Sequence, residues 1–166
     1  DTWEFDGSNW TNVATATAPL SRSNQGMAYD AGRQRIVMFG GWRNDQSGDN
    51  VLNDTWEYDG ITWNQVATIT NPARRAGARL VYAPALGKIV MFGGLSSDSS
   101  LLQDTWLYDG GNWIQISTQH APLPRWDYQL TYDPVRQRVV LFGGLTSGTE
   151  SLVSLGDTWE FDGIDW

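Results

Sequence analysis

The chain has 166 residues, no cysteine and a formal net charge of −8 at pH 7. Its single lysine and negative charge argue against nucleic-acid and anionic-membrane partners, whose phosphates attract a basic surface. Cationic, neutral polar and carbohydrate partners remain open. The lack of cysteine excludes a disulfide framework, thiolate chemistry and a cysteine metal site, and no apolar run of membrane-spanning length predicts membrane insertion.

A ten-residue motif organises the chain. Each copy starts with Asp-Thr-Trp, passes through Phe or Tyr and Asp-Gly, and ends in Trp. The copies occupy residues 1–10, 54–63, 104–113 and 157–166. Their spacings are 53, 50 and 53 residues, a period typical of solenoids, propellers and arrays.

In chain order, the first motif predicts a strand pair within residues 1–14, joined by an Asp-Gly turn. A complete repeat then predicts four short strands. We name these positions a, b, c and d; in the first complete repeat they cover residues 22–29, 35–39, 54–58 and 63–67. The same pattern predicts three units, at residues 22–67, 75–117 and 125–166.

The b strands, such as Ile36-Val-Met-Phe39, are apolar on both faces, whereas the c strands alternate. We therefore expect Ile36 to Phe39 and their equivalents to be almost fully buried, between antiparallel sheets stacked face to face. No helical period is present. An all-β sandwich would not require so regular a repeat, so the sequence favours an all-β β-propeller with four-stranded antiparallel blades.

The recurring glycine pairs and aromatic residues resemble the kelch-repeat family, in particular kelch repeats of bacterial secreted or surface proteins. The glycine pairs are Gly40-Gly41, Gly93-Gly94 and Gly143-Gly144, and the aromatic pairs are Phe5 with Trp10, Tyr58 with Trp63, Tyr108 with Trp113 and Phe161 with Trp166. The aromatic spacing is slightly tighter than the family pattern, and Phe replaces Tyr twice. The resemblance implies a β-propeller and an extracellular or cell-surface location, with the cytoplasm as the alternative.

Three repeats are too few for a closed ring of the usual size, about four to eight blades. Strand c also occurs four times, against three copies of a and b. We therefore expect about three blades of a six- or seven-bladed propeller. The alternative is a homo-oligomer in which two half-rings close together, which requires displacement of the duplicated c strand.

Length variation is confined to one loop per repeat. The distance from the motif Asp to the glycine pair is always 39 residues, as from Asp1 to Gly40. The variable segments are therefore the b–c loops at residues 42–53, 95–103 and 145–156. In an antiparallel meander the b–c and d–a loops share one rim, which we expect to carry a binding function; simple loop drift is the alternative.

Two of the ten tryptophans lie outside the motif, and both fall on this rim. Trp42 has Leu at the equivalent repeat positions, and Trp126 has Ser23 and Ala76. A large aromatic at such positions suits a sugar-stacking platform or an interface anchor, with local packing as the alternative. The candidate binding residues are Trp42, Arg43, Arg74, Arg79, Trp126, Asp127 and Tyr128.

Other candidate chemistry is weaker. Arg22, Arg75 and Arg125 recur at one position, which favours a structural role. Asp45, Ser47 and Asp49 alternate as calcium ligands do, but the loop lacks the glycine and the distant glutamate of an EF-hand. We expect no cofactor and identify no catalytic residue.

These observations favour a binding or scaffolding module for a protein or a carbohydrate. The alternative is part of a carbohydrate-active kelch enzyme, similar to galactose oxidase or a sialic-acid epimerase. Copper chemistry of the first kind needs a cysteine crosslink and several histidines, whereas this chain has no cysteine and only His120.

Overall fold

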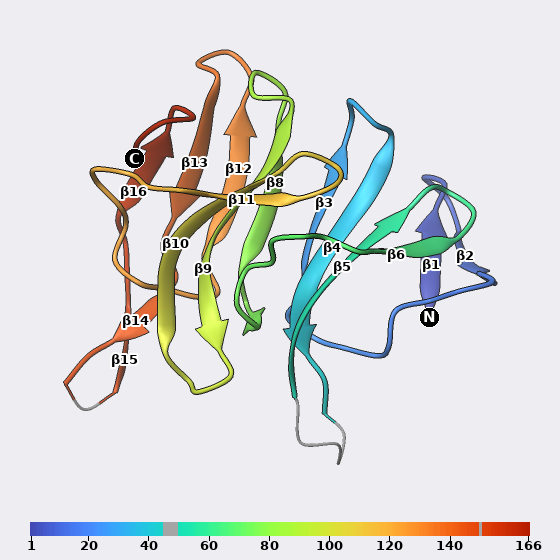
Figure 1. Ribbon diagram of the computed structural model, residues 1–166, viewed down its shortest axis with the longest axis horizontal. Coiled ribbons are helices and arrows are strands. Elements are labelled where there is room, and N and C mark those ends of the chain that lie inside the picture. The colour runs from blue at the N-terminus through green and yellow to red at the C-terminus, as the bar shows by residue number, and fades with distance from the viewer. Residues whose placement is uncertain (45–49, 150) are drawn as a thin grey trace.

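The computed structural model describes residues 1–44, 50–149 and 151–166, and in these ranges the chain forms strands and no helix (Figure 1). The strands are β1 (Thr2–Phe5), β2 (Trp10–Val13), β3 (Gly26–Asp30), β4 (Arg35–Trp42), β5 (Val51–Tyr58), β6 (Trp63–Val66), β7 (Arg75–Ala76), β8 (Arg79–Ala83), β9 (Lys88–Ser96), β10 (Leu101–Tyr108), β11 (Trp113–Ile116), β12 (Gln129–Asp133), β13 (Arg138–Phe142), β14 (Leu145–Ser147), β15 (Leu152–Ser154) and β16 (Thr158–Phe161).

These strands pair antiparallel into five sheets, four of which follow the repeat. Sheet I is β1–β2, and sheet II is β3–β4–β5–β6 in the predicted order a, b, c, d. Sheet III has β9 at its centre, paired with β10 and with both β7 and β8, and β11 pairs with β10. Sheet IV is β12–β13–β16, while β14 and β15 form a separate hairpin. The all-β prediction is thus confirmed.

The glycine pair lets strand b pass close to the next sheet. Gly40 and Gly41 have φ of 62° and 105°, conformations that residues with a Cβ rarely adopt. A Cβ on Gly40 would lie 2.5 Å from the carbonyl oxygen of Arg75. The β4–β5 register also shifts between Phe39 and Gly41. The pair therefore marks a bulge, after which β4 continues into the b–c hairpin.

Adjacent sheets pack against each other through apolar side chains from all four strand positions. Phe39 of sheet II lies in one buried cluster with Leu80, Met91 and Trp113. Sheet III packs on sheet IV through a second cluster that includes Val90, Leu107, Val139 and Phe161. The core is therefore divided among the spaces between successive sheets.

An indole hydrogen bond ties each sheet to the one before it. In all three junctions a strand-d Trp donates its Nε1–H to a strand-c Thr hydroxyl at 2.9 Å. The pairs are Trp63 with Thr2, Trp113 with Thr55 and Trp166 with Thr105. Because the same contact recurs, the motif tryptophans belong to the scaffold.

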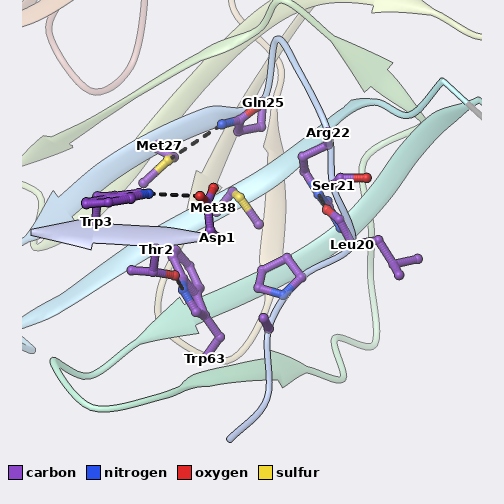
Figure 2. Close-up of a pocket in the computed structure, with 12 residues that line it drawn as sticks. Asp1, Thr2, Trp3, Leu20, Ser21, Arg22, Gln25, Met27, Met38 and Trp63 are labelled. Atoms are coloured by element: carbon purple, nitrogen blue, oxygen red, sulfur yellow. Dashed lines mark hydrogen bonds between the residues drawn. The ribbon is translucent and has the colours of Figure 1, made fainter. Parts of the chain in front are cut away.

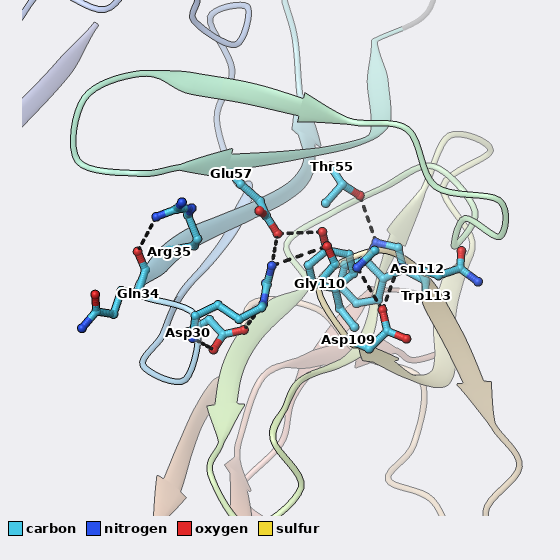
Figure 3. A network of polar contacts seen from close by, with 12 residues as sticks. Asp30, Gln34, Arg35, Thr55, Glu57, Asp109, Gly110, Asn112 and Trp113 are labelled. Carbon is cyan, nitrogen blue, oxygen red and sulfur yellow. Dashed lines mark hydrogen bonds and ion pairs between the residues drawn. The ribbon is translucent and has the colours of Figure 1, made fainter.

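A second junction contact is polar between sheets II and III (Figure 3). Tyr108 donates its hydroxyl to Glu57 at 2.8 Å, and Arg33 donates to the same carboxylate at 2.6 Å. Arg33 also pairs with the buried Asp30 at 2.8 Å and lies over the Tyr108 ring, 5.3 Å from its centroid. Burial and the bond to Glu57 both raise the pKa of Tyr108. Sheets I and II share the simpler bond from Tyr58 to Glu4, at 2.7 Å.

Between sheets III and IV the corresponding residues are all apolar. The four polar residues Asp30, Arg33, Glu57 and Tyr108 have as equivalents Ala83, Leu86, Leu107 and Phe161. Ala83, Leu107 and Phe161 are buried in one cluster, with Leu86 packed against it. All four polar residues of the first junction are thus apolar at the junction of sheets III and IV. No polar side chain of this group is left there without its hydrogen-bond partners.

The predicted burial of strand b is confirmed in sheet III and only partly elsewhere. Ile89, Val90, Met91 and Phe92 of β9 are all fully buried. In β4, Ile36 is only half-buried, and the prediction is wrong for Phe142 of β13, which is 54% exposed. Phe142 follows the same sequence pattern, but no further sheet packs on its side of sheet IV.

Candidate functional site

The b–c hairpins gather on one edge of the molecule. In Figure 1 the β9–β10 connection, and the ends of β4, β5, β14 and β15 from which the other two b–c connections start, lie at the lower edge, whereas the a–b turns, such as β8–β9, lie at the upper edge. We call this lower edge the loop rim. The segments of variable length therefore share one side of the stacked sheets.

A cavity of about 290 Å³ opens on the loop rim between sheets II and III. It joins the b–c hairpins of two repeats with the loop that precedes β7. Its lining residues are Trp42, Asn50, Val51, Arg74, Ser96, Ser97 and Ser99. The lining combines one indole ring with a guanidinium group, an amide and hydroxyls.

Trp42 is the last residue of β4 and is held by backbone bonds on both sides. It is opposite Val51 in the ladder, and it exchanges backbone hydrogen bonds with Ser23 at 2.7 and 2.8 Å. Its side chain is nevertheless 38% exposed. The next residue, Arg43, donates its backbone N–H to Asn50 at 2.7 Å. The strand end therefore fixes the backbone of the indole while part of its surface faces solvent.

Arg74 faces the same cavity and is anchored across the junction. Its Nη1 donates to the carbonyl oxygen of Val51 at 3.0 Å, and the residue is half-buried. The neighbouring Arg75 is completely buried in the scaffold. The guanidinium group of Arg74 is therefore held across the junction, in the lining that it shares with Trp42.

The serine side of the cavity is a tight turn. The Ser96 hydroxyl donates to the carbonyl oxygen of Ser100 at 2.9 Å and also bonds to Asp98. Hydrogen bonds from Ser96 and Ser100 lower the pKa of Asp98 below its usual value. Ser99 has φ of 65°, so the turn is closely specified. Ser97 and Ser99 also line the cavity.

A second group of predicted residues forms at the junction of sheets III and IV. Arg79 pairs with Asp127 at 2.9 Å, and its Nε donates to the carbonyl oxygen of Tyr128 at 3.2 Å. Trp126 packs on Gly77, where an added Cβ would lie 2.9 Å from the indole ring. Asp127 is exposed, whereas Trp126 is only half-buried. These residues form a small charged surface beside a partly packed indole.

Tyr128 belongs to the core rather than to the rim surface. It is completely buried, its hydroxyl bonds to the carbonyl oxygen of Phe92, and it accepts the backbone N–H of Arg79 at 3.0 Å. Burial raises its pKa well above the usual range. A ligand at the surface therefore does not reach this side chain. The equivalent residues Gln25 and Ala78 gave no signal of that role in the sequence.

The three recurring arginines are structural clamps. Arg75 makes a bidentate pair with Asp104, at 2.6 and 2.7 Å, and donates to the carbonyl oxygen of Gly93 at 2.9 Å. Trp106 donates its indole N–H to the same aspartate at 2.6 Å. Each clamp thus ties the start of strand a to the glycine pair and to the motif Asp.

The other two clamps repeat this geometry. Arg22 pairs with Asp54 and Arg125 with Asp157, each at 2.6 Å, and Trp56 and Trp159 donate to those carboxylates. Hydrogen bonds from Arg125 outweigh desolvation and lower the pKa of Asp157 to about 2. The structural role predicted from recurrence agrees with this geometry. The sequence did not identify the motif Asp as the partner, although both positions recur in phase.

Metal chemistry finds no support among the described residues. No group of three or more His, Asp or Glu side chains there could hold a metal ion. The calcium candidate Asp45, Ser47 and Asp49 lies outside the described residues. His120 pairs at the surface with Asp165, at 2.7 Å. In the described ranges no apolar helix reaches membrane-spanning length.

The structure separates the predicted site residues into two groups. Trp42 and Arg74 meet in the cavity with Arg43 beside them, whereas Arg79, Trp126 and Asp127 gather at the next junction. Asn50, Ser97 and Ser99 line the cavity without having been predicted. Their one sequence signal is that they lie in the loops of variable length.

Comparison with known proteins adds no identity. No protein-family model and no curated protein sequence matches the chain.

Proposed function

We propose that this chain is a binding module of the kelch-type β-propeller kind, and that it binds a carbohydrate in the Trp42 cavity. The observation that carries the proposal is the lining of that cavity, which combines the partly exposed Trp42 with Arg74, Asn50 and three serines. A sugar ring offers C–H groups to an aromatic face and hydroxyls to polar neighbours, so it matches both parts of the lining.

The repeat itself argues that this lining is not required for folding. Leu95 and Leu145 stand where Trp42 stands, and Ser21 and Pro124 stand where Arg74 stands. The scaffold therefore accepts residues without an aromatic face or a charge at these positions. The propeller part of the proposal rests on successive antiparallel sheets joined by the same contacts, and on the glycine and tryptophan motifs.

The test uses Trp42→Leu, which inserts the residue found in the other repeats. A sugar identified on a glycan array with the unmodified chain is titrated by calorimetry against the variant. Loss of the stacking face should weaken binding by about 1 kcal/mol or more, roughly fivefold in Kd, with little change in Tm. Arg74→Ser should weaken the same ligand.

Leu145→Ala is the matched control, because it truncates the equivalent side chain away from the cavity and should leave binding unchanged. The proposal fails if no sugar on the array binds, or if a sugar that binds is unaffected by both Trp42→Leu and Arg74→Ser. It also fails if Trp42→Leu unfolds the chain, since the indole would then be part of the scaffold.

A further inference from the structure

Large apolar side chains that no other described sheet covers lie on sheets I and IV and on strand β3 of sheet II. These side chains are between 44% and 66% exposed. They are Trp3, Phe5, Trp10, Met27, Tyr29 and Phe142. Their equivalents in sheet III, such as Leu80, Phe92 and Tyr108, are buried. Exposed apolar patches of this kind mark interaction surfaces.

A cavity of about 420 Å³ lies beside β1, on the edge of that strand which pairs with no other strand (Figure 2). Its apolar lining includes Met27, Met38 and Trp63. Asp1 and Arg22 lie at its polar margin. An apolar cavity next to an unpaired strand edge can receive a strand that carries a large apolar side chain.

At the next two junctions, a strand-b phenylalanine occupies the corresponding space. Phe39 packs edge-on against Trp113, with ring centroids 5.0 Å apart, and Phe92 packs against Trp166 at 5.3 Å. Trp63 of the cavity is the equivalent of Trp113 and Trp166. The third strand-b phenylalanine is the exposed Phe142. The cavity beside Trp63 therefore lacks the phenylalanine found at the other two junctions, and the exposed Phe142 is a phenylalanine of the same repeat position.

The aspartate clamp is incomplete at the same place. Asp1 accepts the indole N–H of Trp3 at 2.8 Å, as the other motif aspartates accept theirs. Asp54, Asp104 and Asp157 each also hold an arginine. Among the described residues no arginine pairs with Asp1. The strand edge of β1 thus lacks both the phenylalanine and the arginine of a neighbouring strand pair.

The two ends of the repeat array share one sequence. Residues 1–7 and residues 157–163 both read Asp-Thr-Trp-Glu-Phe-Asp-Gly. β1 could therefore make every backbone and side-chain contact that these residues of β16 make with β13. It would also bring β2, which follows β1 as a strand d follows a strand c.

We propose that a second copy of this chain covers these faces by strand exchange, with β1 of one copy replacing β16 beside β13 of the other. Phe142 then enters the cavity beside Trp63, and Arg125 clamps Asp1 instead of Asp157. Phe5 takes the place of Phe161 next to Leu107, and Trp10 takes that of Trp166 on Thr105. This inference does not depend on the carbohydrate proposal.

The junction pairs select this arrangement over simple stacking of sheet I on an intact sheet IV. In the chain, Glu4 and Glu57 face tyrosines, and Leu107 faces Phe161. Strand exchange places Phe5 against Leu107. Each glutamate then still faces a tyrosine, and each leucine still faces a phenylalanine. Stacking without exchange would place Phe5 against Glu160. Phe5 has no hydroxyl, so the Glu160 carboxylate would be buried without the tyrosine hydroxyl that Glu4 and Glu57 bind.

The exchange is reciprocal, as a two-fold axis requires. Each copy keeps sheets II and III and shares two hybrid sheets with its partner, so the pair contains six sheets. This number falls within the usual range of about four to eight blades for a closed propeller. In this pair each outer sheet faces a sheet of the partner, and the displaced β16 of each copy lies outside the six sheets.

The first test is the mass of the 166-residue chain by sedimentation equilibrium over a range of concentrations. The expected result is a dimer of twice 18.5 kDa. Phe142→Ser should weaken dimerisation at least tenfold while the monomer stays folded, because that side chain is exposed in the monomer. Ile69→Ser is the control: Ile69 is equally apolar and 97% exposed, but lies off both faces.

A crosslink distinguishes exchange from other dimers. Val140 is opposite Glu160 in the ladder, and Glu4 is the repeat equivalent of Glu160. Because the chain has no cysteine, the pair Val140→Cys with Glu4→Cys should give a disulfide-linked dimer on mild oxidation. Ile69→Cys with Glu4→Cys should not.

The proposal is overturned if the chain is a monomer at every concentration, or if Phe142→Ser dimerises as well as the unmodified chain. A dimer that fails to crosslink through positions 140 and 4 would also contradict it, since its contacts would lie elsewhere. In the proposed dimer Arg125 pairs with Asp1 and not with Asp157. The proposal is therefore also contradicted if Asp1→Asn still dimerises while Asp157→Asn does not.

Discussion

Strands β9 and β13 have nearly the same sequence and different surroundings. β9 contains Ile89-Val-Met-Phe92 and β13 contains Val139-Val-Leu-Phe142. Phe92 is completely buried between Tyr128 and Trp166, whereas Phe142 is 54% exposed. The difference comes from position in the array, because β9 lies between two sheets and β13 has a neighbouring sheet on one face only. In a repeat fold, the burial of a side chain thus depends on whether a neighbouring sheet packs against it, and not on its repeat position alone.

The largest expected effect separates these two phenylalanines. Phe92→Ala should lower the free energy of unfolding by about 3 to 5 kcal/mol, because it empties a closed site between sheets. That is a large share of a total of about 5 to 15 kcal/mol. Phe142→Ala should cost about 0.5 kcal/mol or less in the monomer, as other exposed positions do. Urea unfolding at low protein concentration measures both, and equal costs would refute the comparison.

The sequence predicted what every repeat shares. The period of the Asp-Thr-Trp motif and the two-faced apolar pattern of strand b gave the antiparallel order of the strands. That pattern could not predict the exposure of Phe142, since one sequence does not state which junctions are formed. It also could not place Tyr128, because Gln25 and Ala78 stand at the equivalent positions and the contact with Phe92 depends on the neighbouring sheet.

The candidate site was predictable only where it departs from the repeat. Trp42 was visible because leucine stands at its equivalents, and Arg74 because it does not recur. Ser97 and Ser99 carry no such signal, since serine is common in any loop. Their role on the cavity wall follows from the approach of two hairpins, which is a tertiary feature.

A smaller effect tests whether the polar and apolar junctions are interchangeable units. Glu57→Leu alone leaves the buried Tyr108 hydroxyl without its acceptor and removes one of the two carboxylates that pair with Arg33, and it should cost about 1 to 3 kcal/mol. The fourfold variant Asp30→Ala, Arg33→Leu, Glu57→Leu and Tyr108→Phe copies the junction of sheets III and IV. It should regain most of that loss, to within about 1 kcal/mol of the unmodified chain.

Thermal and urea unfolding of the single and fourfold variants decide the point. If the fourfold variant instead loses the sum of the single losses in free energy of unfolding, the four apolar residues fit only the junction of sheets III and IV. Phe161→Tyr is the reverse control: it places a hydroxyl among Leu86 and Leu107 and should destabilise the chain through an unpaired buried group.

Each inner sheet is protected by its two neighbours, and in the proposed dimer a second copy protects the two outer sheets. Native-state amide hydrogen exchange, read strand by strand at low and high protein concentration, tests this most directly. Amides of β9 should be strongly protected at both concentrations, whereas those of β1 and β13 should gain protection as the dimer forms. Protection of β1 and β13 that equals that of β9 in the dilute monomer, or that does not change with concentration, would contradict the account.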